Sequence, residues 1–259
     1  MMRIFSFRMK MAILNVIQSL FLSAGAYIRP ARAPAMDFIS SFLSAKPCGF
    51  DMEMIGDGSD GTYVLPNDLD GIEMCFSPGV GPSSQFEEAI FDAYGIRSFL
   101  IDASVPSVPT DRDDFFVFDR KFLGASTYGD FIDLETWVMQ HASDEIGKDL
   151  LLQMDIEGAE FSALLACPKD ILKRFRIIAL EVHFLDAMNL EFFASTVEQT
   201  FRKLDEIFVV CYARANDCCG SLRVGSKSFP RVAEVTLIRR DRVVLGNSVE
   251  RREFVIRNL

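Results

Sequence analysis

Glycines, aspartates and a histidine follow four separate strand-like runs of this sequence. In chain order they are the turn with Gly79 and Gly81, then Asp102, Asp155 and His183. In an open parallel sheet, ligands bind outside the carboxyl ends of the strands. The four positions therefore predict a single ligand site along one edge of a sheet.

The glycine turn and Asp102 together indicate a nucleoside cofactor. Glycine lets a ligand approach the backbone closely, and Asp102, 21 residues after Gly81, can accept hydrogen bonds from both ribose hydroxyls. The turn continues with Pro82 and Ser84, without the third small residue of a dinucleotide site and without a phosphate-binding lysine. These features favour S-adenosylmethionine, which has no phosphate; a NAD-type oxidoreductase is the alternative.

Asp155 and His183 are the predicted catalytic residues. A neutral His183 can take the proton of an acceptor hydroxyl. Alternatively, Asp155, His183 and Asn216 hold Mg²⁺ or Mn²⁺, because an oxygen-rich set with one imidazole suits these ions. The helix dipole accounts for Glu160 in a first helical turn, and His141 is interpreted as structural.

The surrounding pattern predicts the elements that position these residues. Strand-like runs alternate with helical patterns from residue 48 onward and give seven strands, which is typical of an α/β fold on a parallel sheet. Ser84 and Glu87 have the spacing of a capping box, and Gly95 can end that helix. Asp133 is expected to cap the next helix.

Several motifs resemble those of the FkbM-like family of S-adenosylmethionine-dependent methyltransferases, over about residues 50–240. The most specific is the run from Met154 to Glu160 (MDIEGAE). The others are the run 60–66 (DGTYVLP), the glycine motif at 76–81, Glu181-Val182-His183, and Asn216 followed by Glu234-Val235-Thr236. The sequence departs from the family pattern at Thr62, at Ser77 and over 214–217.

The resemblance implies a class I, Rossmann-like fold: a seven-stranded, mostly parallel sheet with helices on both faces and the last strand antiparallel. It also implies S-adenosylmethionine as methyl donor. The leading hypothesis for the acceptor is a hydroxyl of a sugar, glycan or small metabolite. The cofactor-binding residues expected from it are Ser77, Gly79, Gly81, Asp102, Phe118, Asp119 and Asp155, with Phe118 and Asp119 flanking the adenine. A catalytically inactive interaction module on the same fold is a further alternative.

Length and composition place limits on the rest of the chain. The 259 residues are divided into an N-terminal extension, 1–35, and a methyltransferase domain, 36–259. The extension is expected to be an amphipathic helix or an anchor, with peripheral membrane contact through residues 1–30 and a linker at 29–35. A net charge of −10 argues against a nucleic-acid partner.

The cysteines bear on the compartment. None of the six forms a C-x-x-C pair, which favours a reducing, cytoplasmic compartment. Adjacent Cys218 and Cys219 are a redox pair or a coincidence within a loop, and coincidence is the preferred interpretation.

Overall fold

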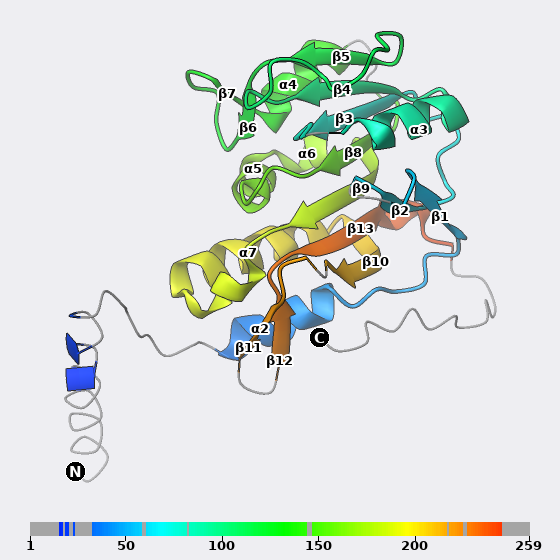
Figure 1. Ribbon diagram of the computed structural model, residues 1–259. Helices are drawn as coiled ribbons and strands as arrows, with labels where there is room; N and C mark the ends of the chain where they lie inside the picture. Colours follow the sequence, from blue (N-terminus) through cyan, green and yellow to red (C-terminus); the bar gives the residue numbers. More distant parts are fainter. Residues whose placement is uncertain are drawn as a thin grey trace.

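The computed structural model describes residues 16–17, 19–20, 23, 33–58, 61–81, 83–143, 147–216, 218–224 and 227–244. Its centre is a seven-stranded sheet with the order β10-β13-β9-β8-β3-β4-β5 (Figure 1). The strands are β3 (Met74–Pro78), β4 (Arg97–Ile101), β5 (Phe116–Asp119), β8 (Leu150–Met154), β9 (Phe175–Val182), β10 (Phe208–Ala215) and β13 (Ala233–Arg239). Only β13, the last in sequence, runs antiparallel to its neighbours within this sheet, as predicted.

The order of the strands creates a switch point in the middle of the sheet. From β3 the chain proceeds outward through β4 and β5. It then returns to the other side of β3 with β8 and continues to β9. Ligands bind at such a reversal, outside the carboxyl ends of the strands. A ligand of this protein is therefore expected above β3 and β8.

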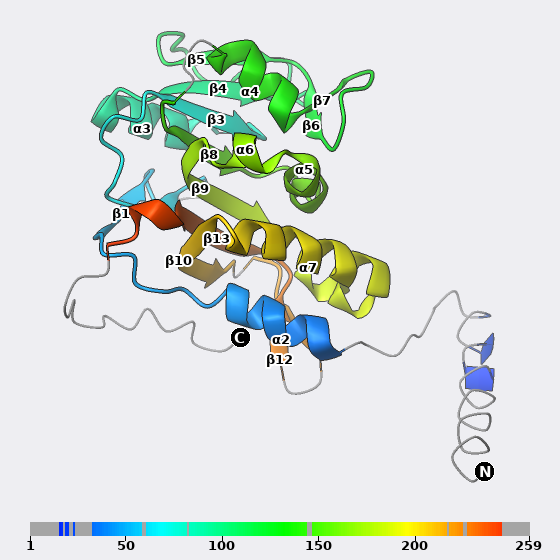
Figure 2. The same cartoon turned by 180° about the vertical axis from the view of Figure 1, so that it is seen from behind.

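Helices cover both faces of the sheet, because successive strand residues point to opposite sides. Phe76 and Leu152 belong to one apolar cluster, and their neighbours Cys75 and Leu151 belong to the other. The first cluster packs against α2 (Ala33–Phe42), α4 (Leu134–Ala142), α5 (Glu160–Ala166), α6 (Lys169–Leu172) and α7 (Glu191–Asp205) (Figure 2). The second packs against α3 (Gln85–Tyr94) and the hairpin of β1 (Met52–Ile55) and β2 (Tyr63–Pro66).

Helix α2 overlaps the segment that was expected to be a linker. Helix α2 begins at Ala33, so it includes the end of the predicted linker. It packs on α7 through Phe42, whose ring stacks on Phe201 with centroids 4.5 Å apart. Most of the expected amphipathic or anchoring segment lies outside the described residues. Among the residues that are described, no helix has the length and hydropathy needed to span a membrane.

The ends of α3 and α4 show which of the predicted helix caps form. Gly95 ends α3 in the left-handed conformation and donates its N–H to Phe91, and Asp133 caps α4 by accepting the N–H of Thr136, both as predicted. The prediction of a capping box formed by Ser84 and Glu87 is wrong. Ser84 stands at the N-cap of α3, but its hydroxyl donates to Glu88 and makes no cap hydrogen bond.

The smaller elements lie outside the main sheet. Strands β6 (Phe122–Gly124) and β7 (Phe131–Asp133) form a parallel pair, and β11 (Ser221–Val224) and β12 (Lys227–Pro230) form a hairpin. Two short 3₁₀ turns, η1 (Leu185–Asn189) and η2 (Arg240–Arg242), follow β9 and β13.

Candidate functional site at the carboxyl edge of the sheet

The glycine turn contacts the loop after β8 across the switch point. Gly79 has a φ of 91°, and a Cβ on it would stand 1.6 Å from the carbonyl oxygen of Asp155. Gly81 has a φ of 57°, and a Cβ there would meet nothing within 4 Å. Because Gly79 has no Cβ, the loops after β3 and β8 can approach each other closely, whereas Gly81 leaves open space beside the turn.

Asp102 lies at the glycine turn, as predicted, and is largely buried. Its Oδ2 accepts the backbone N–H of Val80 at 3.1 Å and that of Gly81 at 3.4 Å, and its Oδ1 accepts the N–H of Ser104 at 2.7 Å. A carboxylate has about four acceptor positions. Asp102 thus fixes the shape of the turn and keeps part of its acceptor capacity for a ligand.

Ser77 is sealed inside the protein and away from the ligand edge. Its side chain is fully buried between Glu87 and Gln153. Burial raises the pKa of Glu87, and the Ser77 hydroxyl lies within hydrogen-bond distance of both the Glu87 carboxyl and the side-chain oxygen of Gln153. Gln153 donates to the hydroxyl of Tyr63 at 2.8 Å. The Ser77 hydroxyl is therefore engaged within the core, and a cofactor contact at Ser77 stays a prediction.

Phe118 and Asp119 stand side by side at the end of β5, with different surroundings. Phe118 is half-buried and packs against the cluster of Val80, Leu100 and Val108, next to the glycine turn. Asp119 Oδ2 accepts from Trp137 at 3.2 Å and lies 2.7 Å from His141 Nε2. Asp119 thus fastens β5 to α4, and His141 has the structural role expected of it.

Asp155 and His183 meet above the ends of β8 and β9, as predicted. The Nε2 of His183 lies 3.7 Å from Asp155 Oδ1 and 3.5 Å from Glu157 Oε2. Asp155 Oδ1 is buried and makes no hydrogen bond with any residue that the structure describes. Glu157, which the sequence interpretation did not assign to the site, is the third member of this group.

Glu160 corrects a second sequence-based interpretation. It stands in the first turn of α5, where the helix dipole was expected to account for it, but its side chain is fully buried and has partners of its own. Its Oε1 accepts from Nδ1 of His183 at 2.9 Å and from the backbone N–H groups of Ile156 at 3.2 Å and Gly158 at 3.0 Å. Glu160 therefore orients the imidazole so that Nε2 faces Asp155 and Glu157.

The cluster shifts the pKa of both predicted catalytic residues. Burial and the neighbouring charge of Glu181 raise the pKa of Asp155 to about 7. Burial alone would lower the pKa of His183, but the hydrogen bond and charge of Glu160, with the charge of Asp155, raise it to about 9. At neutral pH the imidazole is protonated, so His183 does not match the neutral base that the sequence suggested.

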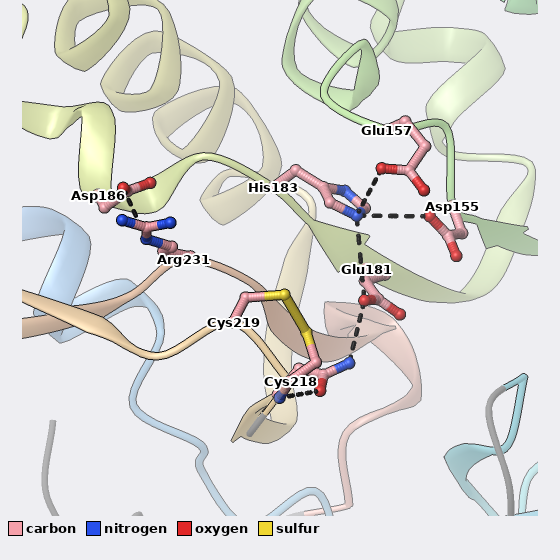
Figure 3. Close-up of a disulfide and its surroundings, with 9 residues drawn as sticks. Asp155, Glu157, Glu181, His183, Asp186, Cys218, Cys219 and Arg231 are labelled. Carbon is pink, nitrogen blue, oxygen red and sulfur yellow. Dashed lines mark hydrogen bonds and ion pairs between the residues drawn. A yellow bond between two sulfur atoms is a disulfide. The ribbon is translucent and has the colours of Figure 1, made fainter.

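Asn216 contacts the group of Asp155, Glu157 and His183 only indirectly, through Glu181. Its Nδ2 donates to Glu181 Oε1 at 3.1 Å, and that oxygen is 4.0 Å from His183 Nε2. Its Oδ1 accepts the N–H of Cys218 at 3.0 Å, and Cys218 is disulfide-bonded to Cys219 (Figure 3). The preferred interpretation of these cysteines as a coincidence is therefore wrong.

The departures from the family pattern have local explanations. Thr62 Oγ1 accepts the N–H of Gly58 at 2.9 Å and so closes the loop before β2. Arg214 lies opposite Glu234 across β10 and β13, and the two side chains form an ion pair of 3.0 Å.

A hollow of about 260 Å³ lies at the opposite, amino edge of the sheet, between Asp149, Lys173 and Arg239. Arg239 and Asp149 form an ion pair of 2.6 Å there. The hollow contains none of the predicted site residues, so we place the site at the carboxyl edge, where those residues converge.

Fold and site together define an open α/β protein with an acidic, imidazole-containing ligand edge at its switch point. No protein-family model and no curated protein matches the chain. Among solved structures, it is similar to a mutant of the 16S rRNA (adenine(1408)-N(1))-methyltransferase from Catenulisporales acidiphilia. The identity is 12%, with 73% of this chain and 97% of that chain covered and a TM-score of 0.29. The fold assignment rests on the sheet itself.

Proposed function

We propose that this chain is an S-adenosylmethionine-dependent methyltransferase that acts on a hydroxyl group. The carrying observation is the convergence of the glycine turn, Asp102, Asp155 and His183 at the ends of β3, β4, β8 and β9, four adjacent strands. The sheet also has the strand number and the antiparallel last strand that the FkbM-like resemblance implies.

The residues at the glycine turn fit a nucleoside with a sulfonium group. Gly81 leaves open space beside the turn, and Asp102 stands at the turn with acceptor capacity for ribose hydroxyls. Phe118 offers an apolar surface next to them. Gly81, Asp102 and Phe118 are thus the residues proposed to hold the cofactor, which supplies the methyl group when bound.

The acidic cluster is the proposed place where the acceptor loses its proton. With a pKa raised to about 7, Asp155 exchanges a proton near neutral pH, as an effective general base must. His183 is protonated and pairs with the neighbouring carboxylates, so it positions Asp155 and an incoming oxygen. In-line methyl transfer needs this positioning and proton removal more than a protein nucleophile.

The acceptor is proposed to be a hydroxyl of a sugar, glycan or small metabolite. Carboxylates accept hydrogen bonds from hydroxyl groups. Glu157 offers such a carboxylate at the surface, because 85% of its side chain is exposed. Polyhydroxylated acceptors fit an edge of this kind.

Isothermal titration of the full chain with S-adenosylhomocysteine tests the cofactor assignment. We expect binding by the wild type and at least tenfold weaker binding by Gly81→Leu, whose side chain fills the open space at the turn. Gly95→Leu is the matched control, because Gly95 also has a positive φ and open space but ends α3 far from the turn. Binding of NADH instead, or no heat from the wild type, contradicts the proposal.

Turnover tests the reaction itself. Incubation with a methyl-labelled donor and a panel of sugars, glycans and small hydroxylated metabolites should give labelled product in at least one case, and Asp155→Asn should reduce its rate by about 10²-fold or more. Equal rates for Asp155→Asn and the wild type would exclude Asp155 as the proton acceptor.

A further inference from the structure

Four carboxylates surround the single imidazole of His183. Glu160 contacts Nδ1 at 2.9 Å, while Glu157, Asp155 and Glu181 lie 3.5, 3.7 and 4.0 Å from Nε2. Four acidic side chains therefore outnumber the one basic side chain among them. The excess negative charge at Nε2 favours a bound cation.

Three donor atoms of this cluster have the spacing of metal ligands. One oxygen each from Asp155 and Glu157 and one ring nitrogen of His183 all lie within 4.8 Å of one another. Ligand atoms around one ion with bonds of about 2.1 Å stand about 3 Å apart. The distances from Nε2, 3.7 Å to Asp155 and 3.5 Å to Glu157, therefore need to contract by roughly half an ångström, and the third separation, which is at most 4.8 Å, closes as the exposed side chain of Glu157 turns inward. Asp155 and Glu157 come from one loop and His183 from the next strand, which fixes their backbones relative to one another.

Buried atoms aimed into the cluster lack hydrogen-bond partners. Only 9% of the His183 side chain is exposed, and its Nδ1 is held by Glu160. Among the described residues its Nε2 makes ion-pair contacts, to Asp155, Glu157 and Glu181, but no hydrogen bond (Figure 3). Asp155 Oδ1 is likewise buried and without a hydrogen bond there. A carboxylate that fixes the far nitrogen of a histidine is typical of metal-ligating histidines. Both atoms take part only in long ion-pair contacts of 3.5 to 4.0 Å, so each keeps its capacity to bind a ligand that comes between them.

We propose that Asp155, Glu157 and His183 bind one divalent cation through their carboxylates and Nε2, and that His183 releases its Nε2 proton to solvent as the ion binds. Two oxygens and one imidazole nitrogen suit Mn²⁺ or Mg²⁺. Glu181, held by Asn216, stands behind the site and adds to its negative charge. The ligand set therefore replaces the predicted Asn216 with Glu157.

The catalytic consequence rests on the proposed methyltransferase function. The three ligands come from one side, and the exposed side chain of Glu157 marks the opening toward solvent. An acceptor hydroxyl that reached the open positions of the ion would have its pKa lowered. Asp155 would then hold the ion through one carboxylate oxygen, and its other oxygen would accept the acidified proton of the acceptor, as proposed above.

Direct binding of Mn²⁺ tests the site without any methyl transfer. The full chain is treated with EDTA, desalted and titrated with Mn²⁺ while the electron paramagnetic resonance signal of free Mn²⁺ is followed. We expect saturable binding with one ion per chain, displaced by Mg²⁺. Glu157→Gln, a surface substitution that leaves the core intact, should weaken Mn²⁺ binding at least tenfold.

Asp170→Asn is the matched control, because Asp170 is an exposed acid on α6, with 94% of its side chain exposed. It should leave Mn²⁺ affinity unchanged. No binding to the wild type at millimolar Mn²⁺, or equal affinities for Glu157→Gln and wild type, overturns the proposal. If S-adenosylhomocysteine binds but Mn²⁺ does not, this inference alone fails; if Mn²⁺ binds but the nucleoside does not, the proposed function alone fails.

Discussion

Gly79→Ala should be among the most damaging single substitutions in this protein. The φ of 91° alone costs an alanine about 1–2 kcal/mol. In addition, its Cβ would lie 1.6 Å from the carbonyl oxygen of Asp155, a backbone atom that cannot rotate away. The loops after β3 and β8 must therefore separate, and we expect a total loss of about 4 kcal/mol in the free energy of unfolding.

Gly81→Ala supplies the matched control. Gly81 also has a positive φ, but its Cβ would meet nothing within 4 Å, so only the conformational cost of about 1 kcal/mol remains. Urea unfolding can be followed by the fluorescence of Trp137, which is the only tryptophan and is fully buried. Equal losses of stability in the two variants would refute the close approach of the two loops.

Three further predictions concern titration and the disulfide. The pKa of Asp155 in the folded protein, about 7, lies above its ordinary value of 3.8. Between these two pH values the folded protein holds a proton that the unfolded chain has released. The contribution of Asp155 to the free energy of unfolding therefore falls as pH rises from about 4 to 7. Asp155→Asn should reduce that slope in thermal melts of the metal-free protein. Burial also raises the pKa of Glu87, so Glu87→Gln should leave stability at pH 7 equal or higher in urea titrations, whereas lower stability would argue for an ionised Glu87. Replacing both Cys218 and Cys219 with serine should change the free energy of unfolding by less than about 1 kcal/mol, because a bond between adjacent residues closes almost no loop; a larger loss in the same titration would contradict this.

Much of the fold was predictable because its signals are local. The apolar run at 150–154 is strand β8 with the same bounds, and Asp155 follows it as expected. Gly95 and Asp133 end and begin their helices as the capping rules predict. Asp155 and His183 could be paired from the sequence because neighbouring parallel strands carry their carboxyl ends to the same edge.

The sequence interpretation failed where a side chain finds its partner far away in the chain. Glu87 has the spacing of a capping residue, but it contacts Ser77, which lies on β3 beneath the helix. Glu160 has the position of a helix-dipole acid, yet it bonds to His183 on the next strand. Local spacing does not encode either contact, because each depends on how the helix packs over the sheet.

The position of β13 has a consequence for how the chain is made. This strand is the last of the sheet to be synthesised, and it lies between β9 and β10, which leave the ribosome earlier. Until it arrives, β9 presents an open edge and β10 has no neighbour in the sheet. Unpaired edges recruit other chains, so nascent or truncated forms that end before residue 233 should depend on chaperones to remain unaggregated.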